Sequence, residues 1–235
     1  MLVTAGALLP SCARTPSGQG NTAGPQLVIN MTVAGQIRPG YFYFILFNVV
    51  PAGSQSTGPI PVVTQPWGNG FATGAFTAFV RIDSTQPNGG YGVYSVQPGS
   101  NLLSFQYLGT PVSFTALSSG GNMIQFQIPL AELATASVPA SQIGQIQVNF
   151  INTNRIPTDP NDPGTKLFDA IGDARVAGGV NNPLSIPTAQ AGLFQNSQLV
   201  PPEPQGDVVQ AGNGTLVSNN DPDLDITNWS IRVVR

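Results

Sequence analysis

Charged residues make up 8% of the 235-residue chain, the formal net charge is −3, and histidine is absent. Without histidine the chain cannot build a Ser-His-Asp triad, a Cys-His dyad or an imidazole site for zinc, so we expect no enzymatic activity. We also expect no binding to nucleic acid, because that requires a clustered basic face and the 8 Lys and Arg residues are scattered. The length suits a single all-β domain.

The chain begins with an apolar run over residues 2–9 that leads into Leu9-Pro10-Ser11-Cys12. This stretch resembles the end of a bacterial lipoprotein signal peptide, although the proline and the lack of a basic start depart from that pattern. The resemblance implies a signal peptide over 1–12 and a lipidated Cys12, which anchors the protein to the membrane on the extracytoplasmic side of the bacterial cell envelope. The alternative is a chance apolar N-terminus with a buried cysteine. Residues 13–25, rich in Pro, Gly, Ser and Thr, predict a flexible tether.

The strongest strand signal lies over residues 41–50, which read YFYFILFNVV. A run of this length that is apolar at both alternating sets of positions predicts a strand covered on both faces. We expect an opposing sheet to cover one face. The second cover is either a short helix near Leu130 or part of the segment 176–220.

Shorter strands, which are separated by turns rich in Pro, Gly, Asn and Ser, are expected along most of the remaining chain. Residues 51–70 predict a loop, and residues 83–90 predict a turn. The strands expected from alternation of apolar and polar residues are 26–33, 76–82, 91–97, 102–108, 112–116, 123–128 and 145–150.

The C-terminal half completes the expected architecture. Residues 129–134 predict one short helix with Pro129 in its first turn. Residues 176–220 are poor in strand signal and predict a long loop with a strand near 183–186 or at Leu193. The last strand, 226–234, is expected beside the N-terminal one. The chain therefore predicts an all-β fold over 26–235, a single antiparallel, jelly-roll-like β-sandwich with one short helix, long loops and an insertion at 176–220.

Three stretches resemble parts of the carbohydrate-binding-module-9-like and DOMON-like sandwiches. They are the strand and helical turn NMIQFQIPLAEL at 122–133, the aromatic run PGYFYF at 39–44, and Asp225-Ile226-Thr227 before the last strand. The resemblance implies the same sandwich fold. It assigns no activity, because the sugar-binding residues of those proteins have no counterparts that can be placed here and the lack of histidine argues against haem.

Acidic residues gather in two places in a chain that has 11 of them. Asp221, Asp223 and Asp225 would lie on one side of an extended segment, and Asp159 and Asp162 lie in a turn-rich stretch. Clustered oxygen ligands on loops are what calcium uses, so both groups are candidate Ca²⁺ sites, the Asp221 group first. The alternative is that these residues simply form turns, and that Arg155, Lys166 and Arg175 neutralise the group around Asp159 and Asp162.

Aromatic side chains provide the candidate ligand-binding residues. Trp67 lies in a glycine-rich loop and Tyr91 follows a turn, and exposed rings in such places suit sugar faces. The alternative for Trp67 is a ring that closes one end of the core. We therefore expect a non-catalytic cell-envelope lipoprotein that binds glycan or another envelope component. The rival expectation is a structural or assembly protein that contacts a partner protein through a sheet edge or the long loop.

Overall fold

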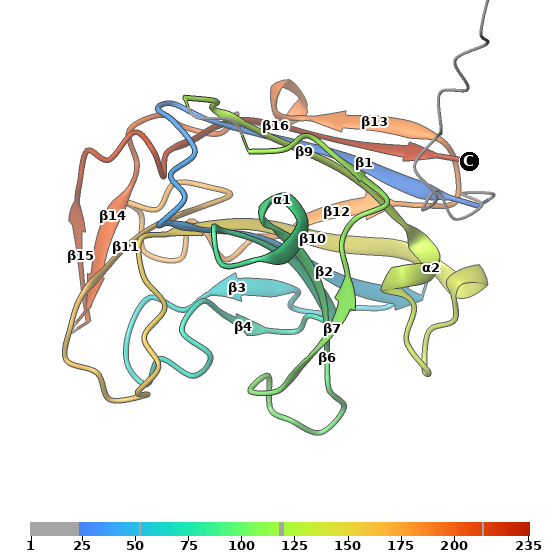
Figure 1. Ribbon diagram of the computed structural model, residues 1–235, viewed down its shortest axis with the longest axis horizontal. Helices are drawn as coiled ribbons and strands as arrows, with labels where there is room; N and C mark the ends of the chain where they lie inside the picture. Colours follow the sequence, from blue (N-terminus) through green and yellow to red (C-terminus); the bar gives the residue numbers. More distant parts are fainter. Residues whose placement is uncertain (1–23, 52, 118–119, 213) are drawn as a thin grey trace, which may run out of the picture.

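The computed structural model describes residues 24–235 apart from residues 52, 118, 119 and 213. Within these residues two antiparallel sheets pack face to face, which confirms the predicted all-β sandwich (Figure 1). The first sheet has five strands in the order β13 (Gly192–Gln195), β16 (Ile226–Val234), β1 (Gln26–Val33), β9 (Met123–Pro129) and β8 (Ser113–Phe114).

The second sheet is larger, with nine strands among the described residues. Its main order is β15 (Thr215–Ser218), β14 (Val209–Gly212), β11 (Lys166–Ala170), β10 (Ile143–Thr153), β2 (Phe42–Pro51), β5 (Ala78–Ile82), β6 (Tyr91–Val96) and β7 (Phe105–Gly109). The ninth strand, β12 (Leu184–Pro187), pairs with the first half of β10, and β11 pairs with the end of β10. The long strand β10 therefore joins two short neighbours on one side to β2 on the other.

Helical structure in the described residues is limited to four short turns. The predicted short helix is confirmed as α2 (Leu130–Leu133), which packs against the intersheet core. The other turns are α1 (Pro87–Gly90), η1 (Ala140–Gln142) and η2 (Asn196–Gln198). Within the described ranges, none of these helices has the length and apolar character needed to span a membrane.

The first and last strands of the sandwich lie side by side. Strand β16 pairs with β1 in antiparallel register, with Leu27 opposite Val233 and Ile29 opposite Ile231. This pairing confirms the predicted position of the C-terminal strand. Most of the segment 176–220 lies outside strands, as predicted, and β12 and β13 lie at the two places where the sequence allows a strand, near 183–186 and at Leu193. The sequence does not predict β14 and β15, so the segment holds four strands in place of one. Each has only four residues, too few for periodicity to stand out.

Strand β2 is buried on both faces, as its sequence predicts. Tyr43, Ile45 and Phe47 point into the core between the sheets, whereas Phe44 and Leu46 point to the outer side of the larger sheet. On this outer side, neither the short helix near Leu130 nor the segment 176–220 is the main cover of β2. The hairpin of β3 (Pro59–Pro61) and β4 (Ala72–Gly74) lies on the outer side of this sheet (Figure 1). The phenylalanines that flank the hairpin pack there, and the segment 176–220 adds Val180. Residues 51–70 are thus more than the predicted loop.

Candidate functional site

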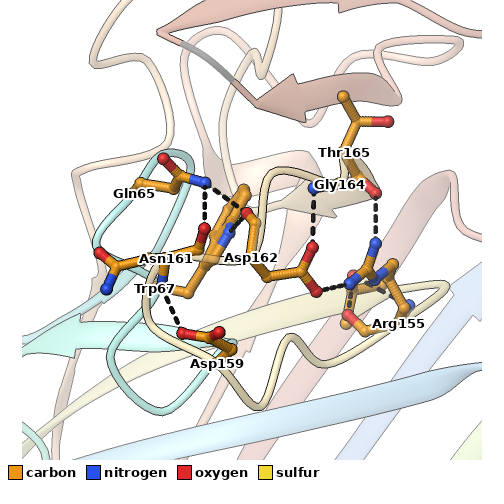
Figure 2. A network of polar contacts seen from close by, with 9 residues as sticks. Gln65, Trp67, Arg155, Asp159, Asn161, Asp162, Gly164 and Thr165 are labelled. Atoms are coloured by element: carbon orange, nitrogen blue, oxygen red, sulfur yellow. Dashed lines mark hydrogen bonds and ion pairs between the residues drawn. The ribbon is translucent and has the colours of Figure 1, made fainter.

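Trp67 is not the exposed sugar platform that its loop predicts. Its ring is fully buried, and its Nε1 donates a hydrogen bond to the carbonyl oxygen of Asp162 at 2.8 Å. The backbone N–H of Trp67 donates to the carbonyl of Pro160 at 2.9 Å, so the loop around Asp162 closes over the indole (Figure 2). The structure therefore agrees with the alternative in that the ring is buried, although Trp67 belongs to neither of the two hydrophobic clusters of the core.

Tyr91 is also buried, which removes the second candidate for stacking on a ligand. Its hydroxyl donates to the carbonyl of Thr115 at 3.0 Å, and its ring lies 4.9 Å from that of Phe114 between centroids. Strand β6 turns this side chain into the intersheet core, where the apolar ring is kept from water. Neither aromatic ring can bind a sugar face in this conformation.

Asp159 and Asp162 form turns in place of a shared cation site. Asp159 Oδ1 accepts the backbone N–H of Asn161 at 2.9 Å, and Asp162 Oδ1 accepts that of Gly164 at 2.7 Å (Figure 2). The second oxygen of Asp162 forms an ion pair with Arg155. This is the arrangement of the alternative prediction, because short side chains in such turns satisfy the local backbone.

Asp221, Asp223 and Asp225 do not converge on one point. Asp221 accepts the hydroxyl of Tyr41 at 2.7 Å, and Asp223 forms an ion pair with Arg38. Asp225 instead accepts the backbone N–H of Gly206 at 3.0 Å. The extended geometry that would align the three carboxylates is not formed, since residues 222–224 make a turn before β16. The predicted calcium site at these residues is therefore not assembled.

A different acidic group is assembled in the interior. One carboxylate oxygen each from Asp169, Glu203 and Asp207 lies within 4.8 Å of the other two, and all three side chains are buried. Strand β11 turns Phe168 and Ala170 to the outer side of its sheet, which directs Asp169 to the opposite face. Glu203 and Asp207 come from the connection between η2 and β14. We call Asp169, Glu203 and Asp207 the acidic cluster.

The acidic cluster receives its hydrogen bonds from backbone amides. The donors are Ile226 N–H to Asp169 Oδ2 (2.6 Å), Ala170 N–H to Asp169 Oδ1 (2.8 Å), Gly172 N–H to Glu203 Oε2 (3.0 Å) and Ala174 N–H to Asp207 Oδ2 (3.0 Å). Oδ1 of Asp207 is buried and has no hydrogen-bond partner among the described residues. Four segments therefore meet at these carboxylates, and one oxygen there is left unsatisfied.

Burial governs the electrostatics of the acidic cluster. Burial first, and then the neighbouring carboxylates, raise the pKa of Glu203 to about 9 and that of Asp207 to about 6. The pKa of Asp169 is raised well above its usual range for the same reasons. Asp225, also buried, lies close enough to add to this repulsion. Such a group holds either protons or a cation near neutral pH.

A pocket of about 540 Å³ adjoins the acidic cluster between residues 171–184 and 199–204. Glu203 belongs to both the pocket wall and the cluster. The apolar wall consists of Ile171, Val176, Leu184, Leu199, Pro201, Pro202 and Pro204, and the polar side chains are Asp173, Asn182 and Glu203. The pocket is therefore mainly aliphatic with a small acidic end.

Comparisons of the chain with protein-family models, with curated proteins and with solved structures give no significant match. The resemblance to carbohydrate-binding-module-9-like and DOMON-like sandwiches stays a prediction. Sequence reasoning missed Glu203 and Asp207 because they lie far from Asp169 in the chain and have no acidic neighbours in a recognisable spacing. The one local signal was Asp169 itself, a carboxylate within an otherwise strand-like run.

Proposed function

We propose that the protein is a non-catalytic binding protein of the cell envelope that holds a small aliphatic molecule in the pocket beside Glu203. The pocket itself carries the proposal. Its volume of about 540 Å³ lies within the range of roughly 300–1,000 Å³ that small-molecule sites occupy. Its wall is formed by two segments of the 176–220 region and its flank, the part of the chain with the least regular sequence pattern.

The chemistry of the wall narrows the ligand class. A sugar carries many hydroxyl groups, each of which loses free energy when it is buried without a partner. Asp173, Asn182 and Glu203 are the only side chains with strong polar groups among the described residues of the wall. An aliphatic body with one hydrogen-bonding end, such as an acyl chain of an envelope molecule, matches this wall better than glycan does.

A charge introduced at the pocket wall is expected to reduce binding of an aliphatic or aromatic probe. Val176 lines the pocket and is 55% exposed, so Val176→Asp should leave the fold intact. We expect the affinity for the uncharged probe N-phenyl-1-naphthylamine, followed by fluorescence, to fall by about tenfold or more, which corresponds to about 1.4 kcal/mol.

The matched control is Val217→Asp, because Val217 is 56% exposed and lies on β15, outside the pocket wall. This variant should bind the probe as the unmodified protein does. Equal probe binding by both variants, or no binding by the unmodified protein, would overturn the proposed ligand site.

The proposed attachment to the envelope rests on Cys12, which lies outside the described residues. When the chain is expressed with its own N-terminus in a bacterial host, we expect it to enter the detergent phase of a Triton X-114 separation. Cys12→Ser should move the protein to the aqueous phase, because a diacylated cysteine supplies the apolar anchor. An aqueous distribution of both forms would contradict the anchor.

A second candidate function, assembly with a partner protein, is favoured by the edge of the larger sheet. All four residues of β15 are exposed, including Leu216 and Val217, and an edge strand offers unpaired backbone groups to an incoming strand. Binding of a partner protein that Val217→Asp abolishes and Val176→Asp leaves unchanged would favour this function over the pocket.

A further inference from the structure

The acidic cluster has the dimensions of a calcium site. Calcium is bound by oxygen ligands at about 2.3–2.6 Å, so two ligands of the same ion can lie up to about 5 Å apart. The carboxylate oxygens of Asp169, Glu203 and Asp207 lie within 4.8 Å of one another. These separations are compatible with one ion that binds all three carboxylates after small side-chain adjustments.

A buried oxygen of Asp207 without a hydrogen-bond partner is a second observation that points to a ligand at the acidic cluster. Its side chain is 0% exposed, and its Oδ1 has no hydrogen-bond partner among the described residues, whereas Oδ2 accepts the N–H of Ala174. Buried polar atoms in folded proteins nearly always have a partner, so an unsatisfied one calls for an ordered water or an ion. Because Asp207 shares the cluster with two further carboxylates, a cation suits this place in particular.

The described residues offer no basic side chain that pairs with the acidic cluster. Arg175, whose positive charge lowers the pKa of Asp207, is exposed, and its side chain donates two hydrogen bonds to Asp173, at 2.8 and 3.0 Å. The partners of the cluster are backbone amides, each with only a partial charge. When a cation displaces the protons that burial favours on these carboxylates, it therefore meets their negative charge without competition from a basic side chain.

The ligand chemistry selects the ion. The three candidate ligands are all carboxylates, and the chain has no histidine and one cysteine, so the softer nitrogen and sulfur ligands preferred by zinc and copper are missing from the cluster. Magnesium dehydrates reluctantly and usually keeps several waters, which a buried site does not readily accommodate. Calcium accepts six to eight oxygens in flexible geometry, so backbone carbonyls can complete its shell.

We infer that Asp169, Glu203 and Asp207 form a calcium-binding site that fastens the connection between η2 and β14 to β11. The site is distinct from the two Asp groups that the sequence predicts, and it is independent of the proposed aliphatic ligand. Because Glu203 also borders the pocket, the bound ion fixes one of its walls in place.

Isothermal titration of the chelator-treated protein with CaCl₂ tests the inference directly. We expect one ion bound per chain and, at a hundredfold excess over Kd, a rise in Tm of about 5–10 °C. Magnesium at the same concentration should give a clearly smaller rise. Absence of heat and of any Tm shift with calcium would overturn the site, and an equal response to magnesium would overturn the choice of ion.

Calcium binding by substituted proteins tests whether the ion is bound at the acidic cluster. Asp207→Asn keeps the shape of the side chain but removes its charge, and should weaken calcium binding by at least tenfold. Glu203→Gln should have the same effect, and circular dichroism shows whether each variant is folded. Asp221→Asn is the matched control, because its carboxylate belongs to the predicted group that is not assembled. Loss of binding in Asp221→Asn with retention in both cluster variants would overturn the assignment.

Discussion

Replacing Phe44 by alanine should lower the free energy of unfolding by about 3–5 kcal/mol, because a large side chain is removed from a site that cannot collapse around the cavity. The ring of Phe44 is fully buried on the outer face of β2 and stacks on that of Phe71, with centroids 4.2 Å apart and planes 3° from parallel. Phe79 lies edge-on at 6.1 Å, so the ring has neighbours on several sides. Urea denaturation at neutral pH measures the loss.

The control for this prediction is Leu103→Ala. Leu103 is 60% exposed, and its truncation should change the free energy of unfolding by no more than about 0.5 kcal/mol. A loss below about 1 kcal/mol for Phe44→Ala would show that the outer face of β2 is not a packed core. That result would leave the intersheet core as the sole source of apolar stabilisation along this strand.

The behaviour of β2 shows what the sequence can predict. Ten residues with apolar side chains at both alternating positions require two covers, and the structure supplies both. The identity of the second cover could not be predicted, because Phe71 and Phe76 follow a loop rich in Pro and Gly in which no periodicity is present. The distinction depends on tertiary packing, which local patterns do not encode.

The candidate site shows where sequence reasoning ends. Asp221, Asp223 and Asp225 are close in sequence and are therefore predicted to form a site. In the structure each carboxylate binds a different partner, so the three do not converge. Asp169, Glu203 and Asp207 are brought together by the pairing of β11 within the sheet and by the return of the chain before β14. Spacing in sequence is a poor guide when the ligands come from strands and loops that meet only in the folded sandwich.

Lys166, the only lysine in the chain, occupies an unusual place for its charge. Its side chain is 1% exposed, its Nζ donates to the carbonyl of Gly70 at 2.7 Å, and Nζ lies 5.3 Å from the centroid of the Trp67 ring. The described residues provide no carboxylate paired with it. Burial lowers the pKa of Lys166 from 10.5 to about 7, and the positive charge of Arg155 contributes in the same direction.

The lowered pKa makes the stability contribution of Lys166 depend on pH in a definite direction. Between about pH 7 and pH 10.5 the unfolded chain binds a proton on Lys166 that the folded chain lacks. The free energy of unfolding contributed by this group therefore rises with pH, by up to about 1.4 kcal/mol per pH unit. The destabilisation is complete below pH 7 and absent above pH 10.5.

Lys166→Met isolates this contribution, because methionine retains an unbranched apolar side chain without the ionisable amine. The variant loses the hydrogen bond to the carbonyl of Gly70, a cost of about 1–3 kcal/mol that does not change with pH. The difference in unfolding free energy, variant minus unmodified protein, should fall by about 3 kcal/mol between pH 6.5 and pH 9.5. Urea denaturation at several pH values measures this difference. The titration of other groups that the substitution leaves unperturbed, such as Glu203, contributes equally to both proteins and therefore cancels in the difference.

A difference that stays constant over this pH range would mean that the ammonium of Lys166 keeps its ordinary pKa in the folded protein. In that case water reaches Nζ, and the packing of Nζ against the Trp67 ring and the closure of the loop over it are looser than the geometry shows. The expected fall of this difference with pH would, in contrast, mean that the amine of Lys166 is neutral above pH 7 and lies beside the indole of Trp67. The burial of Trp67, which removes it as a sugar platform, is then the same packing that lowers the pKa of Lys166.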